Sequence, residues 1–109
     1  MLLPQCETVE CLNSLEEILR VEGIDGIYVG PFDLSAAMGK PGRFYDPEVR
    51  DAIRHVQKAC ADAGKLSFIF AANVSAAKEG FALGYGSVTL GMDATILTDA
   101  VRAHTTALM

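Results

Sequence analysis

The chain has 109 residues, half of them hydrophobic, and a net charge of −5 at pH 7. This length predicts one domain over residues 1–109, with a core of its own. The acidic balance argues against nucleic acid or an anionic membrane as a partner, because both attract basic surfaces. The sequence shows no long apolar run and no signal-peptide pattern, so we expect a cytoplasmic protein with reduced, structural cysteines.

The first part of the chain shows a strand, a helix and a second strand. Residues 2–8 can form a short strand, and apolar residues then recur at helical spacing from Val9. Gly23 is expected to end that helix. Residues 24–30 are a compact apolar run, which is typical of a buried strand.

The next helix has a clear start after a loop rich in Gly and Pro. Asp46 is a strong N-cap residue, Pro47 suits the first helical position, and helical spacing continues to Gly64. We therefore expect a helix that begins at Pro47 and ends near Gly64.

Two further strand and helix pairs complete the pattern, with strands at residues 66–72 and 87–91. Asn73 can cap a short helix that runs to Leu83, and Asp93 can cap the last helix. The apolar face predicted for the last helix consists of Ile96, Leu97, Ala100, Val101 and Leu108.

Four βα units with apolar strands indicate an α/β fold with a parallel sheet covered by helices. Each unit uses about 27 residues, so eight such units would fill the roughly 250 residues of a TIM barrel. A small, open, doubly wound sheet is the alternative, because four units could complete it. Periodicity does not choose between the two.

Distinctive polar residues follow each predicted strand, at the end of the sheet where ligands bind in both architectures. Gln5 and Glu7 are two positions apart and share one face of the first strand, whereas Cys6 points to the other. The residues that follow the later strands are Asp33, Asn73 and Asp93.

Glu7 and Asp33 follow adjacent strands, so their carboxylates can approach each other. Two such charges about 4 Å apart repel by roughly 4 kcal/mol at an effective dielectric constant near 20. Either one carboxyl group is protonated or a hard cation such as Mg²⁺ or Mn²⁺ lies between the two. In the alternative reading, Asp33 only caps a turn and Glu7 is a solvated acid.

The segment from Gly30 to Asp33 has the pattern of an anion site. Gly30 permits close approach of the backbone, and Pro31 starts a helical turn whose next amides, of Phe32 and Asp33, point outward. A plain strand-to-helix turn would give the same pattern.

Three motifs in this order and spacing resemble the C-terminal half of the HpcH/HpaI family of metal-dependent class II pyruvate aldolases. The resemblance covers essentially the whole chain, and its first two motifs are the more specific ones. The motifs are Pro4-Gln5-Cys6-Glu7-Thr8, Val29-Gly30-Pro31-Phe32-Asp33-Leu34-Ser35 and Leu90-Gly91-Met92-Asp93.

The resemblance implies a TIM barrel that cleaves 4-hydroxy-2-oxo acids to pyruvate and an aldehyde. It implies that Glu7 and Asp33 ligate Mg²⁺, Mn²⁺ or Co²⁺, which would polarise the oxo group. Gln5 would bind the oxo-acid, together with the segment Gly30, Pro31, Phe32 and Asp33, whose amides would hold its carboxylate. It also implies a homo-oligomer in which the last helix is exchanged between subunits.

This sequence departs from the family pattern in two ways. Phe32 stands where the family more often has a small residue such as Ala, which would narrow the acceptor pocket. The catalytic histidine and arginine of the family lie in its N-terminal half, so no catalytic residue is assigned in this chain. His55 and His104 are expected on helix surfaces, and Arg43 lies in a loop.

Two further readings follow from the same residues. One is a half-barrel without catalytic activity that binds metal and oxo-acid and self-associates through its open edge strands. The other is a related lyase that acts on CoA thioesters, of the malyl- or citramalyl-CoA type.

Overall fold

The computed structural model describes residues 1–109 and contains a parallel sheet of four strands with helices between them. In chain order, the elements are β1 (Gln5–Cys6), α1 (Val9–Asn13), α2 (Leu15–Leu19), β2 (Gly26–Val29), α3 (Pro31–Ala37), α4 (Pro47–Asp62), β3 (Leu66–Ala71), α5 (Val74–Ala82), β4 (Ser87–Leu90) and α6 (Asp93–Leu108). The predicted α/β fold with four βα units is confirmed. None of the helices is long and apolar enough to cross a membrane.

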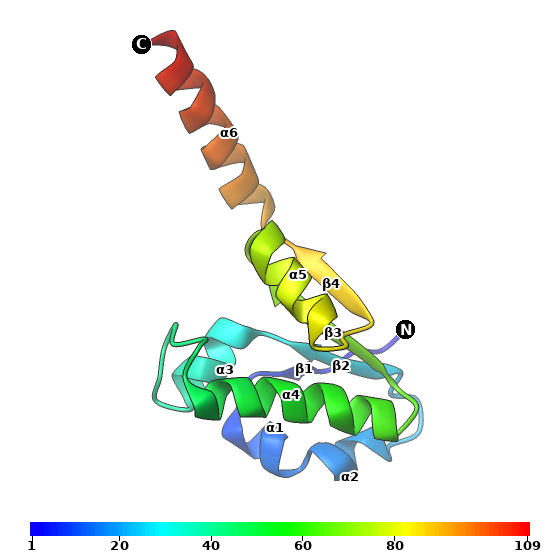
Figure 1. Cartoon of the computed structure of the whole chain (residues 1–109). Helices are drawn as coiled ribbons and strands as arrows, with labels where there is room; N and C mark the ends of the chain where they lie inside the picture. The colour runs from blue at the N-terminus through cyan, green and yellow to red at the C-terminus, as the bar shows by residue number, and fades with distance from the viewer.

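The strands lie in the order β1-β2-β3-β4, and every neighbouring pair is parallel. A doubly wound sheet reverses its strand order at a switch point, whereas a barrel adds its strands in sequence. The observed order is that of the barrel. The open doubly wound alternative is therefore wrong, and β1 and β4 are the edge strands of a curved sheet (Figure 1).

One face of the sheet carries the core, and the reason is the alternation of side chains along each strand. In β2, Ile27 and Val29 are buried toward the helices, while Tyr28 between them stays partly exposed on the opposite face. The core is formed by Cys6, Leu15, Leu19, Ile27, Val29, Leu34, Val49, Ile53, Val56, Ala59, Cys60, Ile69 and Tyr85. Most of these residues come from β2, α2 and α4, so the first half of the chain is the better packed.

The N-terminal segment differs from its prediction in two places. The predicted strand over residues 2–8 is reduced to Gln5–Cys6, because Pro4 has no N–H to donate to a ladder. The single helix predicted from Val9 is broken at Ser14, whose φ and ψ of −111° and 15° are not helical. The other strands and long helices lie within two residues of their predicted ends.

Helix caps account for much of the agreement between the predicted and the observed starts of the helices. The side chain of Asp46 accepts a hydrogen bond from the amide of Glu48, and Asn73 accepts one from Ala76. Both predicted caps are confirmed. The prediction for the last helix is wrong, since Met92 stands at the N-cap of α6 and Asp93 is its first residue.

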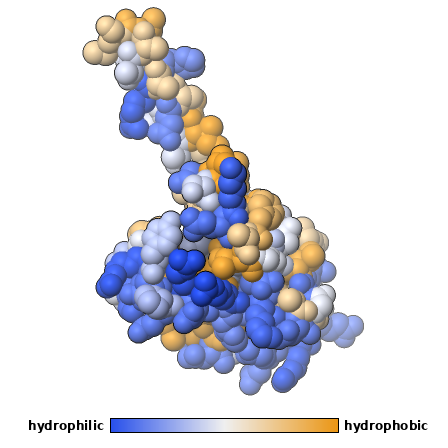
Figure 2. Space-filling model, viewed as in Figure 1, coloured by the Kyte–Doolittle hydropathy of each residue, from blue (hydrophilic) through white to orange (hydrophobic).

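Helix α6 extends away from the rest of the molecule (Figure 1). It has no buried residue, and apolar side chains such as Ile96 and Leu97 are exposed along it (Figure 2). The radius of gyration is 15.7 Å, compared with about 13 Å for a compact chain of this length. The projecting helix explains this difference.

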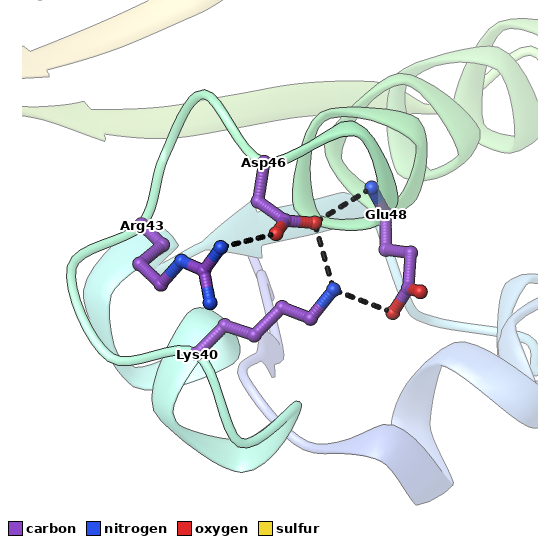
Figure 3. A network of polar contacts seen from close by, with 4 residues as sticks. All are labelled: Lys40, Arg43, Asp46 and Glu48. Atoms are coloured by element: carbon purple, nitrogen blue, oxygen red, sulfur yellow. Dashed lines mark hydrogen bonds and ion pairs between the residues drawn. The ribbon is translucent and has the colours of Figure 1, made fainter.

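The loop between α3 and α4, residues 38–46, is held by a group of ionic contacts (Figure 3). Nζ of Lys40 lies 2.8 Å from Asp46 and 2.9 Å from Glu48, and Arg43 lies 3.1 Å from Asp46. The Lys40 ammonium lowers the pKa of the Asp46 carboxyl group, and Asp46 in turn raises the pKa of Lys40. These contacts fix the loop at the start of α4.

Candidate metal and oxo-acid site

The carboxyl ends of β1 and β2 bring Glu7 and Gly30 side by side. The sheet pairs Cys6 with Val29. Glu7 follows Cys6 at the end of β1, and Gly30 follows Val29 at the end of β2. A methyl group at Gly30 would lie 3.2 Å from Oε2 of Glu7 and 3.5 Å from Oδ2 of Asp33. The two carboxylates therefore converge on the open space beside Gly30.

The distance between the two carboxylates is bounded by this geometry. The sum of the two distances, about 6.7 Å, is the upper limit for the separation of Oε2 of Glu7 and Oδ2 of Asp33. Two unit charges at that separation repel by about 0.6 kcal/mol in water, or about 2.5 kcal/mol at an effective dielectric constant near 20. Glu7 and Asp33 are therefore neighbours, as expected for residues that follow adjacent strands, with a separation of at most about 6.7 Å.

No basic side chain offsets this repulsion. The chain places no Lys, Arg or His nitrogen within 4.0 Å of either Glu7 or Asp33, and neither carboxylate accepts a side-chain hydrogen bond. No group of three or more His, Cys, Asp or Glu side chains could hold a metal ion. Two carboxylates with space for water are nevertheless a donor set that fits a hard divalent cation.

A shallow hollow of about 540 Å³ lies beside the carboxylates, at the carboxyl ends of the strands. It is lined by Gln5, Tyr28, Gly30, Phe32, Asp33, Phe70, Thr89, Gly91 and Met92. The structure thus brings Gln5, Gly30, Phe32 and Asp33 together, as expected from the sequence. Glu7 lies next to Gly30 but is not part of the lining.

The start of α3 leaves backbone amides available near this hollow. Gly30 is the N-cap and Pro31 the first residue of α3, and the first helical hydrogen bond runs from the Leu34 amide to the Gly30 carbonyl. The amides of Phe32 and Asp33 precede it and have no intrahelical partner, as expected for a first turn. The side chain of Asp33 caps neither of these amides. It is therefore free to face Glu7.

The side chain of Ser35 stabilises the first turn of α3. Its side chain is fully buried, and its Oγ donates a hydrogen bond of 2.6 Å to the Phe32 carbonyl. The same Oγ accepts a hydrogen bond of 3.0 Å from the amide of Gly42. Ser35 therefore ties the first turn of α3 to the loop that follows it.

Two of the polar residues expected at the strand ends do not join the site. Asn73 caps α5 and lies outside the hollow. Asp93 accepts a hydrogen bond of 2.7 Å from the neighbouring amide of Ala94. Both side chains thus accept local hydrogen bonds at the start of the helix that follows the strand.

The histidines lie on helix surfaces, as predicted. Nε2 of His55 is 3.3 Å from a carboxylate oxygen of Glu16, and His104 lies on the exposed helix α6. Arg43 pairs with Asp46 in the α3–α4 loop. None of these three residues lines the hollow.

Residues from the middle of the sheet also line the hollow, and no sequence motif predicted them. Phe70 pairs with Thr89 in the register of β3 and β4, and Tyr28 belongs to the same face. Alternation along the strands carries the signal for these positions, since each lies between residues that face the helices. Cys6 of β1 and Cys60 of α4 are buried between the sheet and the helices on the opposite side, and burial raises the pKa of both thiols.

Comparison with known proteins gives a family. The family model described as HpcH/HpaI aldolase/citrate lyase matches residues 1–100. A 4-hydroxy-2-oxo-heptane-1,7-dioate aldolase of Shigella sonnei is 44% identical over 101 residues, which are 93% of this chain and 38% of the relative. The Escherichia coli (strain SE11) protein of the same name is 43% identical over the same length. The chain thus spans less than half the length of the curated relatives that it matches.

Solved structures agree with the sequence match. A HpcH/HpaI aldolase/citrate lyase family protein from Burkholderia cenocepacia J2315 superposes with a TM-score of 0.90 and 32% identity. The match covers 95% of this chain and 40% of that one. The four βα units therefore correspond to part of a TIM barrel. The chain belongs to the HpcH/HpaI aldolase/citrate lyase family.

Proposed function

We propose that this chain carries the divalent-metal and oxo-acid site of a carbon–carbon lyase that cleaves 4-hydroxy-2-oxo acids to pyruvate and an aldehyde. The observation that carries the proposal is the pair of carboxylates, Glu7 and Asp33, that converge beside Gly30 without a basic partner. The names of the relatives from Shigella sonnei and Escherichia coli support the substrate class.

Each residue of the site has a separate task in this proposal. Glu7 and Asp33 would hold Mg²⁺, Mn²⁺ or Co²⁺ through oxygen atoms, with water completing the coordination. Gln5 would donate a hydrogen bond to the oxo-acid, and the amides of Phe32 and Asp33 would hold its carboxylate. When bound, the metal supplies a Lewis acid that polarises the 2-oxo group.

Proton transfer needs residues other than these. Cleavage removes a proton from the 4-hydroxyl group and adds one to the carbon that becomes the pyruvate methyl group. Glu7 and Asp33 are committed to the cation, and Gln5 does not titrate. These residues bind and polarise the substrate, and the complete reaction would use an acid or base from outside the hollow.

Isothermal titration calorimetry with Mn²⁺, with and without pyruvate, tests the site. Glu7→Gln and Asp33→Asn should each weaken Mn²⁺ binding at least about tenfold, because each removes one charged oxygen ligand. Glu22→Gln is the matched control, since Glu22 is exposed and has no ion pair. Equal affinity in all four proteins would refute the site.

The same titration separates the two lyase readings. Mn²⁺-dependent binding of pyruvate without any binding of acetyl-CoA supports an enzyme that acts on free oxo-acids, since a citramalyl-CoA lyase also releases pyruvate. Binding of acetyl-CoA in place of pyruvate would favour the CoA-thioester reading instead.

We also propose that the protein forms a homo-oligomer through α6. The helix has no buried residue, and Ile96, Leu97 and Val101 are more than half exposed on it. Burial of one such side chain in an interface would stabilise the assembly by about 1.5–3 kcal/mol, and the projecting helix of a monomer lacks this stabilisation. Light scattering should show a dimer or larger assembly that Leu97→Glu dissociates, and a monomeric wild-type chain would refute this proposal.

A further inference from the structure

A second and larger cavity lies between α4 and α5, on the helix side of β3. We call it the α4–α5 cavity; its volume is about 620 Å³. Its lining residues lie between Pro31 and Leu83, on α3, α4, β3, α5 and the loops that join them. In the space-filling view, apolar surface is visible at the junction of α5 and α4, bordered by hydrophilic surface (Figure 2).

The floor of the cavity is apolar, and its rim carries exposed aromatic rings. Ile53 and Ile69 are both 6% exposed and belong to the floor. At the rim, Phe32 is 57% exposed, Phe44 40% and Tyr45 69%. Three exposed rings around one apolar cavity are typical of a surface that binds a ligand.

The position of two of these rings is fixed before any ligand binds. Phe44 and Tyr45 belong to the loop that Lys40, Asp46 and Glu48 hold together (Figure 3). The hydroxyl group of Tyr45 also donates a hydrogen bond of 3.2 Å across the cavity to Glu79 of α5. A ligand would therefore bind to aromatic rings that are already in place, and no binding free energy would be lost in ordering them.

One cationic group of the lining has no acid to pair with. The guanidinium group of Arg50 lies over the Tyr45 ring, 5.8 Å from its centroid. No carboxylate oxygen lies within 4.0 Å of Arg50, and its side chain makes no hydrogen bond. Glu79, the one acid of the lining, already accepts the hydrogen bond from Tyr45. Arg50 is therefore the charged side chain of the lining that has no polar partner in the chain, while Glu79 keeps its negative charge and is bonded to Tyr45.

We propose that the α4–α5 cavity binds a small aromatic carboxylic acid, with its ring against Phe32 and Phe44 and its carboxylate on Arg50. Aromatic side chains favour a flat apolar ring, and a planar guanidinium group pairs with a carboxylate through two parallel hydrogen bonds. A short dicarboxylate fits poorly, because its second charge would lie against the apolar floor without a partner. This proposal involves no metal, although the cavity shares Phe32 and Phe70 with the lining of the hollow beside Glu7 and Asp33.

Calorimetric titration of the 109-residue chain with 3-phenylpropionate in the presence of EDTA tests this proposal. The ligand should bind at least about tenfold more tightly than succinate and 3-phenylpropylamine, because neither presents both an apolar ring and a carboxylate. Tighter binding of the amine would overturn the proposal and assign the charge contact to Glu79. The presence of EDTA makes the result independent of whether Glu7 and Asp33 hold a metal.

Two variants and one control locate the contacts. Arg50→Met should weaken binding of 3-phenylpropionate about tenfold, because it removes a charged hydrogen bond and keeps the unbranched apolar stem of the side chain. Arg54→Met, one turn further along α4 and outside the lining, should leave the affinity unchanged. Phe44→Ala removes a rim ring from a loop position and should weaken binding about threefold or more. Unchanged affinity in Arg50→Met and Phe44→Ala would overturn the proposal.

Discussion

The substitution Gly30→Ala should separate metal binding from stability. The added methyl group would lie 3.2 Å from Oε2 of Glu7, where ordinary contact begins at 3.4 Å, and 3.5 Å from Oδ2 of Asp33. It would occupy the space between the two carboxylates and displace the Glu7 oxygen by a few tenths of an ångström. Metal–oxygen distances tolerate only about 0.2 Å, so we expect Mn²⁺ affinity to fall at least about tenfold.

The same substitution should hardly change the free energy of unfolding. Gly30 has φ −99° and ψ 95°, which alanine adopts without strain. Loss of glycine entropy in the unfolded chain contributes about 0.4–1 kcal/mol, and the contact with a flexible carboxylate offsets part of it. The net change in unfolding free energy should therefore be below about 1 kcal/mol.

Calorimetry with Mn²⁺ and urea unfolding followed by circular dichroism measure the two effects. Gly86→Ala is the matched control, because its new methyl group would meet only the Ser67 carbonyl, at 3.7 Å. If Gly30→Ala binds Mn²⁺ within twofold of the wild type, the space beside Gly30 is not the metal site.

Three further predictions concern stability. Gly26→Ala should destabilise by more than about 3 kcal/mol in urea unfolding, since its methyl group would overlap with the Leu66 backbone carbonyl, which cannot move aside as a side chain can. Ser35→Ala should cost about 1–3 kcal/mol in the same measurement, because it removes two partly buried hydrogen bonds, each worth about 0.5–1.5 kcal/mol. Asp46→Asn should lower the melting temperature at pH 7, and the difference from wild type should shrink as the pH falls towards 3. Lys40 depresses the folded-state pKa of Asp46, so the stabilisation exists above the unfolded pKa and is lost as the folded group is protonated. A difference independent of pH would contradict this assignment.

The order of the elements, and the end of the sheet at which polar residues gather, follow from local patterns in the sequence. Asp46 and Asn73 were identified as caps because a side chain that bonds an amide two or three residues away acts locally. Gln5 and Glu7 were placed on one face by the period of a strand. The positions of Glu7 and Asp33 after two predicted strands are likewise visible in the local sequence.

The register and the order of the strands depend on contacts between residues that are distant in the sequence. The register of Cys6 with Val29 places Glu7 beside Gly30, and no local pattern encodes a register between strands 23 residues apart. The strand order, which excludes the doubly wound sheet, is likewise not encoded by any local pattern. The α4–α5 cavity depends on the contact of Tyr45 with Glu79 across 34 positions of the chain.

The break at Ser14 and the projection of α6 also depend on tertiary packing. Apolar periodicity predicts that a segment is a helix, but it does not say whether the helix stays continuous or which surface covers it. Leu15 and Leu19 are buried on the second of two short helices, whereas Ile96 and Leu97 on α6 remain exposed. Similar sequence patterns thus had opposite outcomes, because burial is a property of the neighbours that the fold supplies.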